Sequence, residues 1–188
     1  MPFIIDDNFL SDIEIKEINK RFYEIPSLFA PFTTHPGEEK LPSITDKYSN
    51  RFMYTSYDDQ DERSDKLGIE ILKKFCIKNK IEYRSVMRIR RNTSFLCNDI
   101  RPSEPHTDNG KSHLVFLYYV NDSDGDTILY KNKYNKEQDN DMIIDTIISP
   151  KAGRAILFDG SVYHSFCYPN INDIRSTINI NIEKSKPK

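Results

Sequence analysis

The spacing of hydrophobic residues along the chain is at first helical and later strand-like. One apolar stripe runs from Phe9 to Phe22 and another from Leu67 to Phe75, both at mostly helical spacing. Ser11 is placed to cap the first helix, and Glu14, three positions later, completes a capping box. The pattern therefore predicts two amphipathic helices, the second over residues 64–78, with their apolar stripes packed on a core.

After Lys80 the hydrophobic period changes to two, which is typical of strands. Short alternating runs are separated by Asn-Gly, Asp-Gly, Pro and Asn-rich turn signals. Strands are expected over residues 3–5, 51–57, 85–96, 105–108, 112–120, 126–131, 142–148, 154–158, 162–167 and 175–183. From residue 85 onward they are short and evenly spaced, which favours an antiparallel double-sheet jelly roll. The predicted class is mainly β (α+β), a double-stranded β-helix core with the N-terminal helices packed on its larger sheet.

The chain of 188 residues has no repeat and no interdomain linker, so one domain over residues 1–188 is expected. Residues 1–84 would provide helical support, and residues 85–183 the jelly-roll core. Between residues 26 and 50, prolines and a glycine interrupt a polar stretch with little periodicity. We expect a long loop there, either a lid or wall beside a substrate or an ordinary surface excursion.

Composition narrows the choice of partners. The 27 basic and 29 acidic side chains nearly cancel, so no global field attracts nucleic acid or an anionic membrane. The odd number of cysteines, without metal-ligand spacing, indicates reduced thiols. No apolar stretch approaches the roughly 20 residues that span a bilayer, and the first residues do not form a signal peptide. We expect a cytoplasmic protein with no nucleic-acid or membrane partner.

Two histidines and an aspartate carry the clearest chemical signal. His106 and Asp108 are two apart on a predicted strand, so both side chains leave the same face and can converge on one ion. His164 comes much later, on another predicted strand, and a jelly roll brings the two segments together when both belong to the smaller sheet. Two imidazoles and one carboxylate form the ligand set of non-haem Fe(II) oxygenases.

The last predicted strand supplies a second signal, because its two faces differ. Ile178, Ile180 and Ile182 share the face that would pack against the helices, whereas Arg175 and Thr177 point to the interior. An interior arginine needs an anionic partner, since an unpaired buried charge is costly. A bound dicarboxylate would supply that partner through a bidentate contact. Tyr119 lies on a strand face from which its phenol can reach the same ligand.

The predicted strand over residues 85–96 places Val86, Arg88, Arg90 and Asn92 on one face, with Met87, Ile89 and Arg91 on the other. The cluster of arginines could contact nucleic acid, line a pocket for an anionic or polar substrate, or form a solvated strand face. The pocket interpretation is preferred, because the net charge is −2 and no aromatic residues are interleaved.

The order of motifs resembles the Fe(II)/2-oxoglutarate-dependent dioxygenases, most closely the prolyl-hydroxylase-like branch. The motifs are His106-Thr-Asp108, Tyr119-Val-Asn-Asp, Gly125-Asp-Thr127, Pro150-Lys-Ala-Gly-Arg154, Phe158 to His164, and Arg175-Ser-Thr177. They cover roughly residues 85–183, and the opening Phe9-Leu-Ser11 also suits that branch. Arg175 follows His164 by 11 residues, a slightly longer separation in sequence than in close prolyl hydroxylase relatives, and the extra residues fall in the loop 169–173.

The resemblance implies Fe(II) on His106, Asp108 and His164, with O2 and 2-oxoglutarate as co-substrates. Arg175 would bind the remote carboxylate of 2-oxoglutarate, with help from Tyr119 and Thr177. The implied reaction hydroxylates a C–H bond of a small-molecule or peptidyl substrate, such as a prolyl residue, and releases succinate and CO2. The alternatives are a catalytically inactive jelly-roll binding module and a cupin-type metalloenzyme that does not use 2-oxoglutarate.

Overall fold

The computed structural model describes residues 3–24, 28–31, 52–56, 65–98, 101–134 and 141–185. The described helices are α1 (Asp12–Glu24) and α2 (Lys66–Asn79). The described strands are β1 (Ile4–Asp6), β2 (Leu28–Pro31), β3 (Phe52–Ser56), β4 (Tyr83–Phe95), β5 (His113–Tyr119), β6 (Thr127–Lys133), β7 (Ile144–Ile148), β8 (Ala155–Asp159), β9 (Val162–Phe166) and β10 (Ile174–Lys184). Both predicted helices and a predominantly β fold are therefore confirmed.

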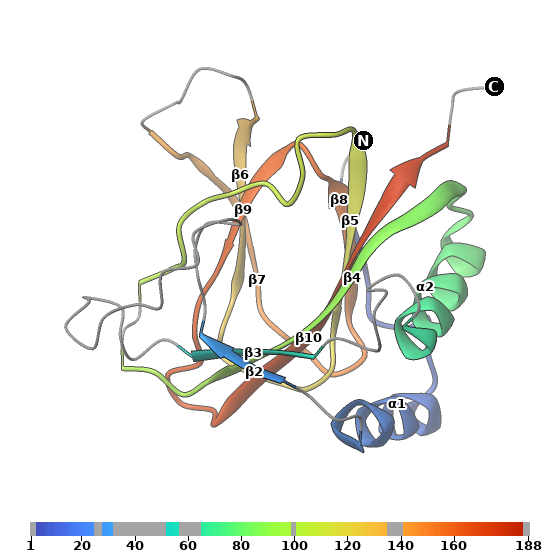
Figure 1. The fold of residues 1–188 in the computed structure, drawn as a ribbon, viewed down its shortest axis with the longest axis horizontal. Helices are drawn as coiled ribbons and strands as arrows, with labels where there is room; N and C mark the ends of the chain where they lie inside the picture. The colour runs from blue at the N-terminus through green and yellow to red at the C-terminus, as the bar shows by residue number, and fades with distance from the viewer. Residues whose placement is uncertain are drawn as a thin grey trace.

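The strands form two antiparallel sheets, as expected for a jelly roll. The larger sheet has the order β1-β8-β5-β10-β4-β3-β2, and the smaller sheet has the order β7-β6-β9. An isolated antiparallel bridge between His106 and His164 adds one further chain segment beside β9. Figure 1 shows the two sheets facing each other, with α1 and α2 together on the outer side of the larger sheet. The predicted double-stranded β-helix with helices on its larger sheet is confirmed.

The capping box of α1 forms as predicted. The Glu14 carboxylate accepts a hydrogen bond from the Ser11 backbone N–H at 2.7 Å, and the Glu14 N–H donates to Ser11 Oγ at 3.4 Å. Ile18 and Phe22 are buried, but Ile13 is 81% exposed. Ile13 therefore does not belong to the buried stripe, because the contact face of α1 is narrower than the hydrophobic pattern indicated.

The second helix is joined to the larger sheet by a buried ion pair. Asp65 caps α2 by accepting from the Gly68 N–H at 2.9 Å, and it also binds the Arg91 guanidinium of β4 through two hydrogen bonds of 2.5 and 2.6 Å. A Cβ at Gly68 would lie 3.0 Å from the Ile89 side chain, so glycine allows α2 to approach the sheet closely. These contacts place Ile89 and Arg91 on one face of β4, as predicted, and show that this face is turned toward α2.

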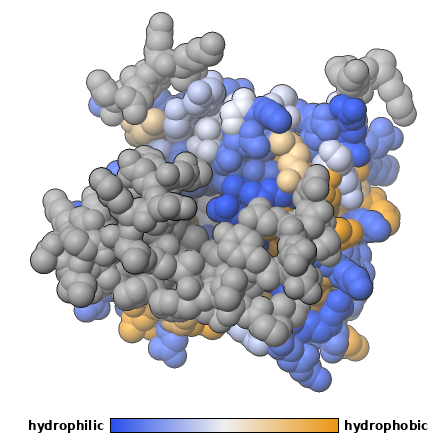
Figure 2. Space-filling model, in the orientation of Figure 1, coloured by the Kyte–Doolittle hydropathy of each residue, from blue (hydrophilic) through white to orange (hydrophobic). Residues whose placement is uncertain are grey.

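Two apolar clusters lie on the two faces of the larger sheet. The outer cluster joins the helices to β5, β8 and β10, and includes Phe75, Phe116 and Ile180. The inner cluster lies between the sheets and includes Leu117, Leu129 and Phe158. The coloured surface in Figure 2 is mainly hydrophilic with scattered hydrophobic side chains, as expected when the large apolar residues are gathered in these clusters.

Three sequence predictions need correction. Residues 105–108 do not form a strand; His106 makes only the single bridge, and the chain bends at Asp108. Val86 packs against the outer cluster, opposite to its predicted face, because an irregularity in the β4–β10 register between Val86 and Arg88 shifts the alternation. Within the predicted loop 26–50, residues 28–31 form β2. The other residues of that stretch, and with them the predicted lid or wall, lie outside the described part.

Candidate metal and co-substrate site

The backbone places His106 directly opposite His164. Each N–H donates to the other residue's carbonyl, at 3.0 Å from His106 and 2.9 Å from His164. Residues paired in this way have side chains on the same face of the sheet. The two imidazole centroids are 4.6 Å apart, so one backbone bridge brings together histidines that are distant in sequence.

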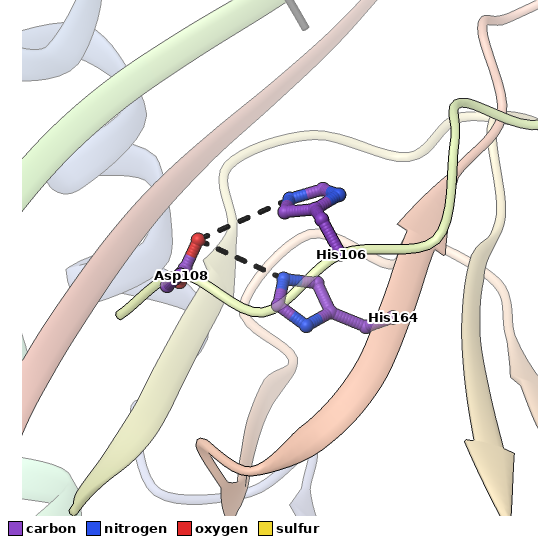
Figure 3. A group of neighbouring side chains, drawn as sticks. All are labelled: His106, Asp108 and His164. Atoms are coloured by element: carbon purple, nitrogen blue, oxygen red, sulfur yellow. Dashed lines mark ion pairs between the residues drawn. The ribbon is translucent and has the colours of Figure 1, made fainter. Parts of the chain in front are cut away.

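Asp108 completes the group from the bend that follows His106. Its Oδ1 lies 4.0 Å from His106 Nε2 and 3.8 Å from His164 Nε2. Figure 3 shows the Nε2 edges of both rings turned toward this oxygen. All three potential ligand atoms lie within 4.8 Å of one another. The structure thus brings together the three predicted metal ligands, although through a bridge and a bend rather than a continuous strand.

The partners of the imidazoles select the tautomer that leaves Nε2 available. His106 Nδ1 lies 2.9 Å from the Glu104 carbonyl, and His164 Nδ1 lies 3.4 Å from the Val162 carbonyl. In a neutral ring, an Nδ1–H that donates to a carbonyl leaves a lone pair on Nε2. Histidine ligands of metals are commonly oriented by a hydrogen bond of this kind.

The electrostatics of the group favour a bound cation. Burial lowers the pKa of His164 to about 4, despite the opposing effect of Asp108, so this ring is neutral near pH 7. Burial raises the pKa of Asp108, but the positive charges of Arg88 and of the His164 ring, which is protonated in the acidic range where Asp108 titrates, outweigh burial. The carboxyl pKa therefore lies below its usual range. The Nε2 of His164 is buried and has no hydrogen-bond partner among the described residues. Two ring lone pairs and a carboxylate therefore face one point, where a metal ion fits.

Two further side chains hold the Asp108 carboxylate. Arg88 Nη2 lies 2.9 Å from Oδ1, and the Asn179 side-chain amide donates to Oδ2 at 3.1 Å. A carboxylate has about four lone-pair positions, so these contacts leave acceptor capacity for a metal. They fix the orientation of a ligand that lies outside any regular strand. Alternation along β10 puts Asn179 on the same face as Arg175 and Thr177, but its role at Asp108 was not predicted.

Arg175 lies at the other end of the same cavity and is buried without an ion pair among the described residues. Its Nε donates to the Gly125 carbonyl at 2.6 Å, and its Nη2 donates to Thr127 Oγ1 at 2.8 Å. The guanidinium carbon lies 5.4 Å from the Phe166 ring centre and 5.7 Å from that of Tyr119. Burial lowers the pKa of this guanidinium. An anion in the cavity would supply the missing charge partner.

Thr127 was not predicted as a site residue, yet its hydroxyl links Arg175 to Tyr119. The Tyr119 hydroxyl donates to Thr127 Oγ1 at 2.7 Å. Because Arg175 donates to the same oxygen, both Thr127 lone pairs are used, and its own O–H remains to donate. Thr127 lines the cavity, as does Thr177. Tyr119 is fully buried, and its phenol is connected to Arg175 through Thr127, so its contact with a ligand stays a prediction.

One cavity of about 100 Å³ connects the two ends of the site. Its lining includes the metal-type group, Arg175 and Thr177, together with the three predicted substrate residues Arg88, Arg90 and Asn92. The β4 face with its arginines therefore borders the site, instead of forming a separate surface. A glycine is required at position 125 beside it, because a Cβ there would lie 2.7 Å from the Arg175 side chain.

Comparisons with known proteins identify the class of fold. No family model and no curated protein sequence matches the chain. Among solved structures, a prolyl hydroxylase from Trichoplax adhaerens in complex with a hypoxia-inducible-factor peptide has a TM-score of 0.59 at 14% identity, covering 97% of this chain and 83% of its own. The α-ketoglutarate-dependent epimerase SnoN from nogalamycin biosynthesis has a TM-score of 0.62 at 13% identity, covering 96% and 78%.

A third similar structure, HygX from Streptomyces hygroscopicus, contains nickel and 2-oxoglutarate. It has a TM-score of 0.60 at 8% identity, covering 97% of this chain and 83% of its own. The chain thus has the fold of the 2-oxoglutarate- and iron-dependent oxygenases, including prolyl hydroxylases, as the resemblance of motifs implied. Neither described helix has the length and apolar character that crossing a bilayer requires.

Proposed function

We propose that this protein is an oxygenase that uses Fe(II), 2-oxoglutarate and O2 to hydroxylate a C–H bond of its substrate. The observation that carries the proposal is the coincidence of two unsatisfied groups in one cavity. Two imidazoles and a carboxylate converge at one end, and at the other end the buried Arg175 has no acidic partner among the described residues. Fe(II) satisfies the first group, and the remote carboxylate of 2-oxoglutarate satisfies the second.

Each residue has a defined task in this proposal. His106, Asp108 and His164 would hold Fe(II) on one side, and Arg88 and Asn179 would keep the Asp108 carboxylate oriented. Arg175 and the Thr127 hydroxyl would orient 2-oxoglutarate, while Thr177 borders the same end. When bound, iron with 2-oxoglutarate and O2 supplies the oxidising power and yields succinate and CO2. Leu117 and Phe166, the apolar residues among the described lining, would help to exclude water.

The substrate is proposed to be a small molecule or a peptidyl residue. The similar structures include a prolyl hydroxylase with a peptide and an epimerase from the biosynthesis of a natural product. The resemblance of motifs to prolyl hydroxylases suggests a prolyl or other peptidyl residue as the substrate. That step is an analogy between folds, and residues of this chain near the metal site must specify the substrate.

The proposal is tested by adding Fe(II) and 2-oxoglutarate to the protein without oxygen. We expect a visible charge-transfer band from the chelate, and succinate when air is admitted. Absence of both would refute the oxygenase. That result would favour an inactive binding module. One contact supports this alternative, because the Arg88 guanidinium already neutralises the Asp108 carboxylate without a metal. A metal-dependent activity without 2-oxoglutarate consumption would instead indicate a cupin-type enzyme.

A further inference from the structure

The three arginines that line the cavity have different partners. Arg88 is paired with Asp108, and Arg175 donates hydrogen bonds to Gly125 and Thr127. Arg90 makes no ion pair and no side-chain hydrogen bond with any described residue, and its Nε is buried without an acceptor. The guanidinium of Arg90 is therefore the one cationic group at the cavity that no described residue holds.

The strand register places Arg90 beside the metal-type group. Arg90 is opposite Asn179 on β10, the residue that holds Asp108, whereas Arg175 is opposite Ser94. Asn179 and Arg175 are four residues apart along β10, which corresponds to roughly 13 Å. The backbone of Arg90 therefore does not lie at the Arg175 end of the cavity. Arg90 is instead positioned to contact a molecule that lies next to the metal.

The described residues around the cavity carry an excess of positive charge. Among them, the lining contains three guanidinium groups and a single carboxylate, that of Asp108. In the proposed oxygenase, bound Fe(II) and the 2-oxoglutarate dianion have equal and opposite charges, so they do not change this balance. Once both are bound, this excess of positive charge attracts an anionic substrate and disfavours a cationic one.

We propose that the substrate carries an oxyanion, such as a carboxylate, phosphate or sulfate group, and that Arg90 binds this group beside the metal. The inference rests on the proposed oxygenase function and defines its substrate class. A guanidinium binds such groups through two parallel hydrogen bonds, which fix the orientation of the ligand as well as its position. Arg90 would thereby determine which C–H bond of the substrate faces the metal.

The test uses sulfate as the probe, because it is an oxyanion that does not precipitate Fe(II). The protein is first loaded with Fe(II) and saturating 2-oxoglutarate without oxygen, and the visible band verifies loading. Sulfate is then titrated by calorimetry at constant ionic strength. We expect saturable binding that Arg90→Gln weakens at least about tenfold and Arg90→Lys weakens less, with the visible band retained.

Arg84→Gln is the matched control, since Arg84 lies on the same strand and forms an exposed ion pair with Glu183. It should leave sulfate binding unchanged. Absence of saturable binding to the wild-type protein, or equal binding to Arg90→Gln, would overturn the inference. The inference would also be overturned if Arg90→Gln lost as much 2-oxoglutarate affinity as an Arg175 variant, because Arg90 would then bind the co-substrate. Failure to form the visible band refutes the oxygenase itself, and sulfate titration of the metal-free protein still reports on Arg90.

Discussion

The two faces of β10 differ in what their buried residues contribute. On the outer face, Ile178, Ile180 and Ile182 are fully buried among apolar side chains of the helices and neighbouring strands. On the inner face, Arg175 and Asn181 are also buried, but Arg175 has no ion pair in the described part and both polar atoms of the Asn181 side chain lack a hydrogen-bond partner there. The same strand is therefore satisfied on one side and unsatisfied on the other.

This difference indicates that the outer face of β10 mainly stabilises the fold, whereas the inner face is available for ligand binding. Apolar burial on the outer face stabilises the fold by roughly 2 kcal/mol per fully buried side chain. Burying polar or charged groups without partners costs free energy. At Arg175, which lines the cavity, the inner face accepts that cost, as expected when a ligand supplies the missing partner. The four predictions below test whether the two faces respond as differently as the structure indicates.

The largest effect is expected on the outer face. Ile180→Ala removes a fully buried side chain and should lower the free energy of unfolding by about 4 kcal/mol, measured by urea denaturation. Below the unfolding transition, Fe(II) affinity should remain within about twofold of wild type. Ile77→Ala is the control, because Ile77 is 80% exposed and its truncation should cost less than about 0.5 kcal/mol. Equal destabilisation by both variants would remove the basis of the comparison.

The proposed metal ligands should show the opposite response. His106→Ala should reduce Fe(II) affinity by more than about 100-fold, because it removes one of the three proposed ligands, and calorimetric titration measures the change. The His106 side chain is 41% exposed, so thermal unfolding of the metal-free protein should hardly change. Wild-type iron binding by this variant would show that His106 is not a ligand.

Arg175→Met tests whether the buried guanidinium is present for a ligand. The variant should weaken 2-oxoglutarate binding by about 30-fold while Fe(II) still binds, because a charged hydrogen-bonded contact is lost. Without ligand, its free energy of unfolding should match or exceed that of wild type, since an unpaired buried charge is removed. Arg175→Lys should retain part of the affinity. Destabilisation of the ligand-free protein by more than about 2 kcal/mol would instead indicate a structural arginine.

Asp159 differs from Arg175 because its charge has partners within the fold. Its carboxylate accepts from Lys184 at 2.8 Å and from the Ser161 N–H at 3.0 Å. Burial raises the pKa of Asp159, but these hydrogen bonds outweigh it and lower the pKa to about 2. The unfolded state therefore binds the proton more readily than the folded state. The contribution of ionised Asp159 to the free energy of unfolding is complete above about pH 4 and is lost as the pH falls toward 2.

Asp159→Asn should accordingly cost about 2 kcal/mol at pH 7, and the difference from wild type should shrink toward pH 2. Denaturant unfolding at several pH values measures both quantities. A difference that stays constant across this range would mean that packing, and not the charge of Asp159, stabilises the turn between β8 and β9.

The sequence correctly predicted the features that depend on residues close together in the chain. The Ser11 capping box formed because both of its residues lie within one helical turn. The two faces of β10 were predictable because alternation along a regular strand depends on spacing alone. The face of Val86 was predicted wrongly, since a register irregularity between two strands leaves no signal in either strand by itself.

The sequence by itself determined the fold class, the division of β10 into apolar and polar faces, and the residues that can ligate a metal. Residue type and local spacing are sufficient for these conclusions. Only the tertiary structure decided that one backbone bridge aligns His106 with His164 and that Thr127 joins Tyr119 to Arg175. It also decided that Arg88 is paired, whereas Arg90 has no ion pair within the described part of the chain. These relations depend on contacts between segments distant in the chain, and such contacts exist only after the sheets have packed together.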